Sequence, residues 1–111
     1  MVELRITVRS VLQEADIDAY LQGFRIPKPP APHIPALYRD SYQEIVRGAF
    51  VDGSINGILL GYRIGRMCQV QLLHASGNFE DKVKGVLLES IRDWTSQLDL
   101  NLRFNESVTV R

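Results

Sequence analysis

The stretch Asn78–Phe104, NFEDKVKGVLLESIRDWTSQLDLNLRF, contains the change of periodicity that decides the fold. In its first part, apolar residues recur every three or four positions, as on one face of a helix. They are Phe79, Val83, Val86, Leu87, Ile91, Trp94 and Leu98. From Leu98 to Phe104, apolar residues alternate with polar ones, which is typical of a half-buried strand. The sequence therefore predicts a helix that leads directly into a strand, and these elements supply much of the core.

The start of this helix carries residues that suit a helix N-terminus. Asn78 is the expected N-cap, because its side chain can accept a hydrogen bond from a free backbone N–H. Glu80 and Asp81 fall in the first turn, where acidic side chains interact favourably with the helix dipole. We therefore expect the helix to begin directly after Asn78.

The first part of the chain predicts a strand, a helix and a connector. Alternation over Val2–Val8 predicts a strand with one apolar face. A helix is expected from about residue 11 or 13 to 22, with Gly23 at its end. All five prolines lie between residues 27 and 35, so residues 25–35 are expected to form an extended, proline-rich connector. Two PxxP spacings leave open a second role for it, as a docking peptide for an aromatic groove.

The middle of the chain predicts a second helix and a hairpin. Pro35 is the expected start of the helix, and its apolar stripe is Tyr38, Tyr42, Ile45 and Ala49. Between Ile55 and Ala75, alternation predicts two strands joined by a tight turn at Gly65 and Arg66. Glycines recur every four residues from Gly53 to Gly65, and in strands such glycines are expected to mark bulges or close backbone approach.

The order of these elements predicts a single α+β domain over residues 1–111. The expected sheet is mainly antiparallel, with the helices packed on one face, in the order β-α-(α)-β-β-α-β. This order is that of the split-βαβ or ferredoxin-like arrangement. The other sheet face would then be open, which favours self-association.

The composition argues against several classes of function. The chain is 45% hydrophobic and 23% charged, as in average globular proteins. Thirteen basic and thirteen acidic side chains cancel, so a general nucleic-acid binder is not expected. No apolar run approaches the roughly 20 residues of a membrane span, and the N-terminus has no signal-peptide pattern. We expect a cytoplasmic protein without nucleic-acid or membrane partners.

The sequence offers few residues for catalysis or metal binding. Cys68 is the only cysteine, so no intramolecular disulfide can form, and we expect it to be buried. His33 and His74 are the only histidines, and they are far apart in the sequence, so no metal site is expected. His74 and Ser76 are two residues apart, but this spacing defines no hydrogen bond between them. No catalytic residue is predicted.

The segment Ser76-Gly77-Asn78 is a candidate anion site. It follows an expected strand and opens the helix, so its backbone N–H groups would point toward one spot. Lys82 and Lys84 follow within the next turn or two. The alternative is that Asn78 only caps the helix and that the lysines pair with neighbouring acids.

Three segments resemble the GNAT acetyltransferases. Residues 5–21, RITVRSVLQEADIDAYL, resemble the opening strand and helix of that family. Residues 55–65, INGILLGYRIG, resemble its second strand, with the frequent Gly-Tyr pair. Residues 83–107, VKGVLLESIRDWTSQLDLNLRFNES, resemble its acetyl-CoA helix, the following strand and the terminal Asn region. The resemblance covers about half of the chain and implies a GNAT-like fold, acetyl-CoA as cofactor and N-acyltransferase activity.

The resemblance also implies a set of cofactor-binding residues, and it departs from the family there. The set is Ser76, Gly77, Asn78, Lys82, Lys84 and Gly85. The pyrophosphate loop of the family has Arg or Gln, two further residues, Gly, one residue, and then Gly or Ala. Only Gly85 fits, and alignment on Leu87-Leu88 places Lys82 and Lys84 where glycines are expected. Side chains at these positions obstruct the close approach of phosphates to the backbone.

Two functional hypotheses follow. The first is a small non-catalytic domain for protein–protein interaction, assembly or regulation, which has a protein partner or forms a homodimer and needs no cofactor. The second is a GNAT-like acyl-CoA-dependent N-acyltransferase, or a degenerate relative of one, with acetyl-CoA as cofactor.

Overall fold

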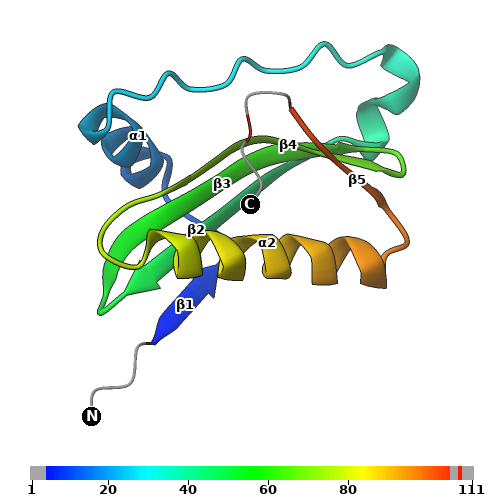
Figure 1. The fold of residues 1–111 in the computed structure, drawn as a ribbon. Helices are drawn as coiled ribbons and strands as arrows, with labels where there is room; N and C mark the ends of the chain where they lie inside the picture. Colours follow the sequence, from blue (N-terminus) through cyan, green and yellow to red (C-terminus); the bar gives the residue numbers. More distant parts are fainter. Residues whose placement is uncertain (1–4, 106–107, 109–111) are drawn as a thin grey trace.

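The structure, a computed structural model, describes residues 5–105 and residue 108. One sheet of five strands, in the order β1-β2-β3-β4-β5, organises these residues (Figure 1). Neighbouring strands from β1 to β4 are antiparallel, and β5 is parallel to β4. The elements are β1 (Ile6–Arg9), α1 (Glu14–Gly23), the 3-10 helix η1 (Ala36–Ser41), β2 (Gln43–Val51), β3 (Ser54–Ile64), β4 (Met67–Ala75), α2 (Glu80–Gln97) and β5 (Asn101–Phe104).

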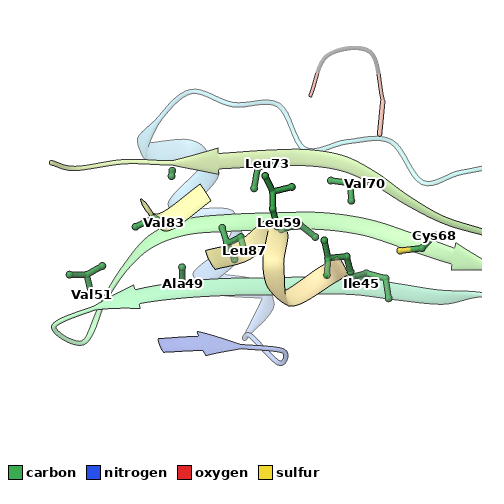
Figure 2. Close-up of a cluster of buried hydrophobic side chains, with 12 residues drawn as sticks. Ile45, Ala49, Val51, Leu59, Cys68, Val70, Leu73, Val83 and Leu87 are labelled. Atoms are coloured by element: carbon green, nitrogen blue, oxygen red, sulfur yellow. The ribbon is translucent and has the colours of Figure 1, made fainter. Parts of the chain in front are cut away.

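The helix and strand predicted at the end of the chain are confirmed. α2 buries Val83, Leu87 and Ile91 against one face of the sheet. Figure 2 shows Val83 and Leu87 among side chains of β2, β3 and β4, including Leu59 and Val70. β5 begins at Asn101, because Asp99 adopts a left-handed conformation that turns the chain out of the helix. The change of periodicity near Leu98 therefore marks the boundary between α2 and β5.

The predicted hairpin is also confirmed. β3 and β4 are joined at Gly65 and Arg66, and Gly65 has a φ of 58°. A tight two-residue turn needs this positive φ, which glycine adopts without steric cost. The N-terminal strand is confirmed over Ile6–Arg9, whereas residues 2–4 of the prediction lie outside the described part of the chain.

The predicted second helix is wrong. Only the six residues Ala36–Ser41 are helical, as a 3-10 turn, and Gln43–Val51 form strand β2. Tyr38, Tyr42, Ile45 and Ala49 have helical spacing, but Ile45, Arg47 and Ala49 also alternate, and all three are buried in the strand. β2 pairs with both β1 and β3, and this pairing overrides the local pattern.

The α+β class with a mainly antiparallel sheet is confirmed, but the helices do not share one face. α2 covers the sheet face that carries Leu59, whereas α1 covers the opposite face, which carries Ile58 and Leu60 (Figure 1). These three residues are consecutive in β3, so they point alternately to the two faces. The ferredoxin-like alternative is also wrong, because the connection through α1 joins two adjacent antiparallel strands, β1 and β2, whereas that arrangement needs a parallel crossover there.

The start of α2 differs from the prediction. Phe79, not Asn78, occupies the N-cap position, and no side-chain hydrogen bond caps the helix there. The Phe79 carbonyl accepts the first helical hydrogen bond, from the Val83 N–H at 2.9 Å. The helix start is therefore stabilised by Glu80 and Asp81 in its first turn without a capping side chain.

Residues 25–35, which we call the strap, form the predicted extended connector, and they cross the sheet on the α1 side (Figure 1). Residues 26–35 contain neither helix nor strand. The strap contacts β4, where the Gln71 Nε2 donates a hydrogen bond to the Pro30 carbonyl over 3.2 Å. None of the helices in the described ranges is long and apolar enough to cross a membrane.

Candidate functional site

A bulge in β4 lies at the centre of the candidate site. Leu60 of β3 pairs with Leu72, but the next residue, Gly61, pairs with Val70, so Gln71 is an extra residue on β4. Such a bulge redirects side chains and bends the strand. The pairing of β4 with β5 covers only Met67–Val70, and so it ends where the bulge begins.

Gly61 makes this bulge possible. An added Cβ at this position would lie 2.2 Å from the Gln69 carbonyl oxygen, which is far inside van der Waals contact. The two backbones therefore approach more closely than a side chain would allow. This confirms, at Gly61, the expectation that a strand glycine marks close backbone approach.

The strap encloses a pocket of about 450 Å³ beside the bulge, which we call the strap pocket. Its volume is within the range of small-molecule sites. The strap and the start of α1 form one wall, and β2, β3 and the bulge form the other. The main apolar lining comes from Leu12, Ile17, Pro29, Pro30, Val46 and Leu60, and the polar lining comes from Glu14, Lys28, Tyr42, Glu44 and Gln71.

The charges of the strap pocket are unevenly paired. The Lys28 Nζ lies 3.5 Å from a Glu14 carboxylate oxygen and 3.8 Å from one of Asp18. Both contacts are solvent-exposed, so they contribute little stability. Among the described residues, no ion pair includes Glu44. Glu44 is thus a lining carboxylate without an ion-pair partner among the described residues.

Two tyrosines flank Glu44. Tyr42 lies two residues before it in the chain, and Tyr62 is its direct cross-strand partner on β3. The two rings have centroids 6.4 Å apart and planes inclined by 30°. Burial, and then the nearby Glu44 and Tyr62, raises the pKa of the Tyr42 hydroxyl. Tyr42 is therefore a neutral phenol at neutral pH, and both rings lie close to the carboxylate.

A second polar cluster connects α1 with the end of β4. The Tyr20 hydroxyl is hydrogen-bonded to the His74 Nδ1 over 2.8 Å, and the Phe24 ring packs on the imidazole with centroids 4.9 Å apart. Burial raises the pKa of Tyr20, and a hydrogen bond with Ser76 partly offsets this rise. Burial and then Lys84 lower the pKa of His74, whereas Glu80 raises it. This cluster attaches α1 to the sheet with an uncharged imidazole.

Ser76 and Gly77, two of the predicted cofactor residues, are held by a neighbouring strand. The Asn56 carbonyl accepts hydrogen bonds from the Ser76 backbone N–H at 2.8 Å and from its Oγ at 3.3 Å. Gly77 has a φ of 84°, and an added Cβ there would lie 2.9 Å from the Asn56 Nδ2. Asn56 is the extra residue of a second bulge, between Ile55 and Gly57 of β3. The loop is therefore fixed by packing on β3.

The other predicted residues do not gather around this loop. Asn78 is exposed. Lys82 and Gly85 line a shallow hollow next to Ile6 of β1, whereas Lys84 lies near His74 of β4. The two lysines thus extend from α2 toward different strands, on either side of the sheet centre. No described contact unites the six residues into one site.

The pyrophosphate of acetyl-CoA would need hydrogen-bond donors and positive charge at the start of α2. The first turn of α2 carries Glu80 and Asp81, whose charges repel a phosphate group at the helix N-terminus. The two lysines diverge, and Gly85 lies in the exposed second turn with no atom within 4 Å of an added Cβ. The residues present therefore do not fit the pyrophosphate in the manner of the GNAT loop.

Cys68 is fully buried, as predicted. Burial raises the pKa of its thiol, although Arg47 and Arg63 lower it. Over the ranges that the structure describes, no group of three or more His, Cys, Asp or Glu side chains is placed to hold a metal ion.

Sequence reasoning missed the strap pocket. Glu44 and Val46 of β2 continue the alternation of Tyr42, which directly precedes the strand in an extended conformation, so the three share one face. This period of two was the available signal. This signal was hidden because Tyr42 also belongs to the stripe with helical spacing, Tyr38, Tyr42, Ile45 and Ala49, which predicts a helix over the same residues. No sequence pattern marks Gln71 as a lining residue, because only the register of β3 against β4 makes it the bulge residue.

The sheet order, the single parallel pair and the two helices define an α+β fold that is compatible with the GNAT acetyltransferases. Among solved structures, the chain is similar to an aminoglycoside acetyltransferase from an uncultured soil metagenomic sample, determined in complex with trehalose. The match has a TM-score of 0.56 and 14% identity, and covers 96% of this chain and 78% of the other. At this identity it shows a shared fold. No family model matches the sequence, and neither does any curated protein sequence.

Proposed function

We propose that the protein is a degenerate relative of the GNAT acyltransferases that binds a small organic molecule in the strap pocket. The observation that carries this proposal is the pocket itself, which combines apolar walls with a few convergent polar groups next to the β4 bulge. The likeness in fold to an acetyltransferase supports it. The loop of residues 76–85 does not fit the cofactor phosphates, so we propose binding without acyl transfer.

Amide NMR of the labelled protein tests this proposal. Ethanolamine, putrescine, arginine and glucose would be added separately at millimolar concentration. We expect at least one amine to shift the amide resonances of Leu60 and Gln71, which line the pocket. Ala31→Trp places an indole at the exposed strap wall of the pocket and should abolish these shifts. Ala36→Trp adds the same group at an exposed residue outside the pocket and should preserve them.

Two outcomes would contradict the proposal. One is that neither these four compounds nor choline shifts these resonances. The other is that the shifts persist in Ala31→Trp, since binding would then occur elsewhere on the protein.

Acyl transfer is the second candidate function, and one specific observation favours it. Beyond the bulge, Leu72–Ala75 of β4 pair with β3 on one side, and the described pairing of β4 with β5 has ended. An extended amide-bearing chain could pair with such a strand edge. A thermal-shift titration with acetyl-CoA separates the two candidates, because a ligand that binds only the folded state raises the melting temperature. Saturable binding would favour acyl transfer, and no shift at millimolar ligand would favour the degenerate relative.

A further inference from the structure

Tyr42, Glu44 and Tyr62 form a corner at one end of the strap pocket, and this corner has the composition of a cation receptor. Tyr42 and Glu44 line the pocket directly, and Tyr62 adjoins Glu44 across the β2–β3 ladder. Aromatic faces attract cations within about 6 Å of the ring centroid. Because the two centroids are 6.4 Å apart, one cation can lie within this range of both rings.

Glu44 supplies the charge that complements such a cation. No described ion pair includes its carboxylate, whereas the other lining acid, Glu14, is already paired with Lys28. A bound cation would therefore not have to displace a lysine or arginine from Glu44. The only basic side chain in the pocket wall is Lys28, which is held on the α1 side by Glu14 and Asp18.

The apolar lining of the strap pocket favours a methylated cation over a primary ammonium. A primary ammonium has three N–H donors, each of which loses a water partner on binding and needs a new acceptor. A quaternary ammonium has no N–H donor, and its methyl groups suit the lining of Pro29, Ile17 and Leu60.

We infer that the ligand of the strap pocket is a small methylated ammonium compound, whose head group is held by Tyr42, Glu44 and Tyr62. This inference rests on the proposed function, because it names the chemical class that the same pocket takes. A quaternary ammonium has no nitrogen lone pair and cannot be acylated at nitrogen, so a quaternary head group also agrees with binding without acyl transfer.

Calorimetric titration with choline, ethanolamine and the neutral carbon isostere of choline tests the inference. We expect choline to bind more tightly than ethanolamine, and the uncharged isostere to bind at least about tenfold more weakly than choline, because it lacks the attraction to the rings and the carboxylate. Ala31→Trp should abolish choline binding, and Ala36→Trp should not.

Matched variants test whether the residues of the corner hold the head group of choline. Glu44→Gln keeps the shape of the side chain and removes its charge, and Tyr42→Leu removes the ring; each should weaken choline binding by about fivefold. Tyr42→Phe keeps the ring and should change the affinity by less than about twofold. Glu44 is exposed and Tyr42 is half-exposed, so all three variants are expected to fold.

The outcomes separate this inference from the proposed function. If ethanolamine or another compound binds in the wild type but not in Ala31→Trp, and choline does not, the pocket is a binding site and the methylated class is wrong. If the isostere binds as tightly as choline, the site is an apolar cavity and the corner is not a cation receptor. If no compound binds, both the inference and the proposed function are wrong.

Discussion

At the scale of single residues, two glycines, one in a strand and one in a helix, have opposite effects on stability. Gly61 lies where β3 approaches the bulge of β4, and its backbone faces the Gln69 carbonyl directly. Gly85 lies in the interior of α2 on the exposed side, where an added Cβ meets no atom within 4 Å. In a helix interior, glycine is less favourable than alanine because the unfolded chain has more freedom to lose.

Alanine substitutions at these glycines should therefore have opposite effects. We expect Gly61→Ala to lower the free energy of unfolding by about 2–3 kcal/mol, because the backbone must move to relieve the clash. Gly85→Ala should raise the free energy of unfolding by about 0.5–1 kcal/mol. Urea denaturation of the two variants measures both changes. Equal effects would show that the β3–β4 contact at the bulge is not as close as described.

His74 should make stability depend on pH. Its folded-state pKa is lowered by burial and then by Lys84, while Glu80 opposes this, so the folded protein binds a proton less readily than the unfolded chain. The stability from neutral His74 is thus fully present above the unfolded pKa of about 6.5, and it is lost as the pH falls from there toward the lower folded-state pKa.

Chemical denaturation across this pH window tests the effect of His74. His74→Gln should flatten the loss of stability below about pH 6.5, because the titrating group is gone. His33→Gln is the control for removing a histidine, since His33 is exposed on the strap. If the pH dependence of stability is unchanged in His74→Gln, groups other than His74 cause it.

At the scale of elements, α2 begins without a capping side chain. Phe79 holds the N-cap position without a capping hydrogen bond, and its side chain is 45% exposed. A serine there could not cap the helix without a backbone shift, because Phe79 has a φ of −119° and a ψ of 30°, whereas a capping residue is typically extended. The covered part of the Phe79 ring would also be lost.

Phe79→Ser should therefore destabilise the protein by about 1 kcal/mol, measured as a shift in the urea midpoint, because apolar burial is lost and no cap is gained in place. Asn78→Ala is the matched control. It should change stability by less than about 0.5 kcal/mol, because Asn78 is exposed and does not hold the N-cap position. A large loss in the control would restore Asn78 as the capping residue.

At the scale of the whole molecule, self-association stays a prediction. The open sheet face that first motivated it is covered by α1 and the strap, so another surface must provide the contact. Val11 and Leu37 are apolar side chains with 82% and 84% exposure, respectively. If they mediate a dimer, light scattering at micromolar concentration should give twice the 12.6 kDa monomer mass, and Leu37→Glu should return the monomer. A monomer mass for the wild-type chain would contradict the prediction.

The sequence by itself determined the elements whose signals are local. The apolar stripe from Val83 to Ile91 specified α2, the glycine at position 65 specified the hairpin turn, and the prolines of the strap excluded regular structure there. Each of these depends on the conformational preference of neighbouring residues, which a sequence shows directly.

Only the tertiary structure decided the rest, because it depends on pairing between distant residues. Strand β2 formed against a helical pattern once β1 and β3 supplied its hydrogen bonds. Gln71 became a bulge residue only through the register of β3 on β4. The strap pocket combines residues from α1, the strap and three strands, and no local pattern in the chain encodes that combination.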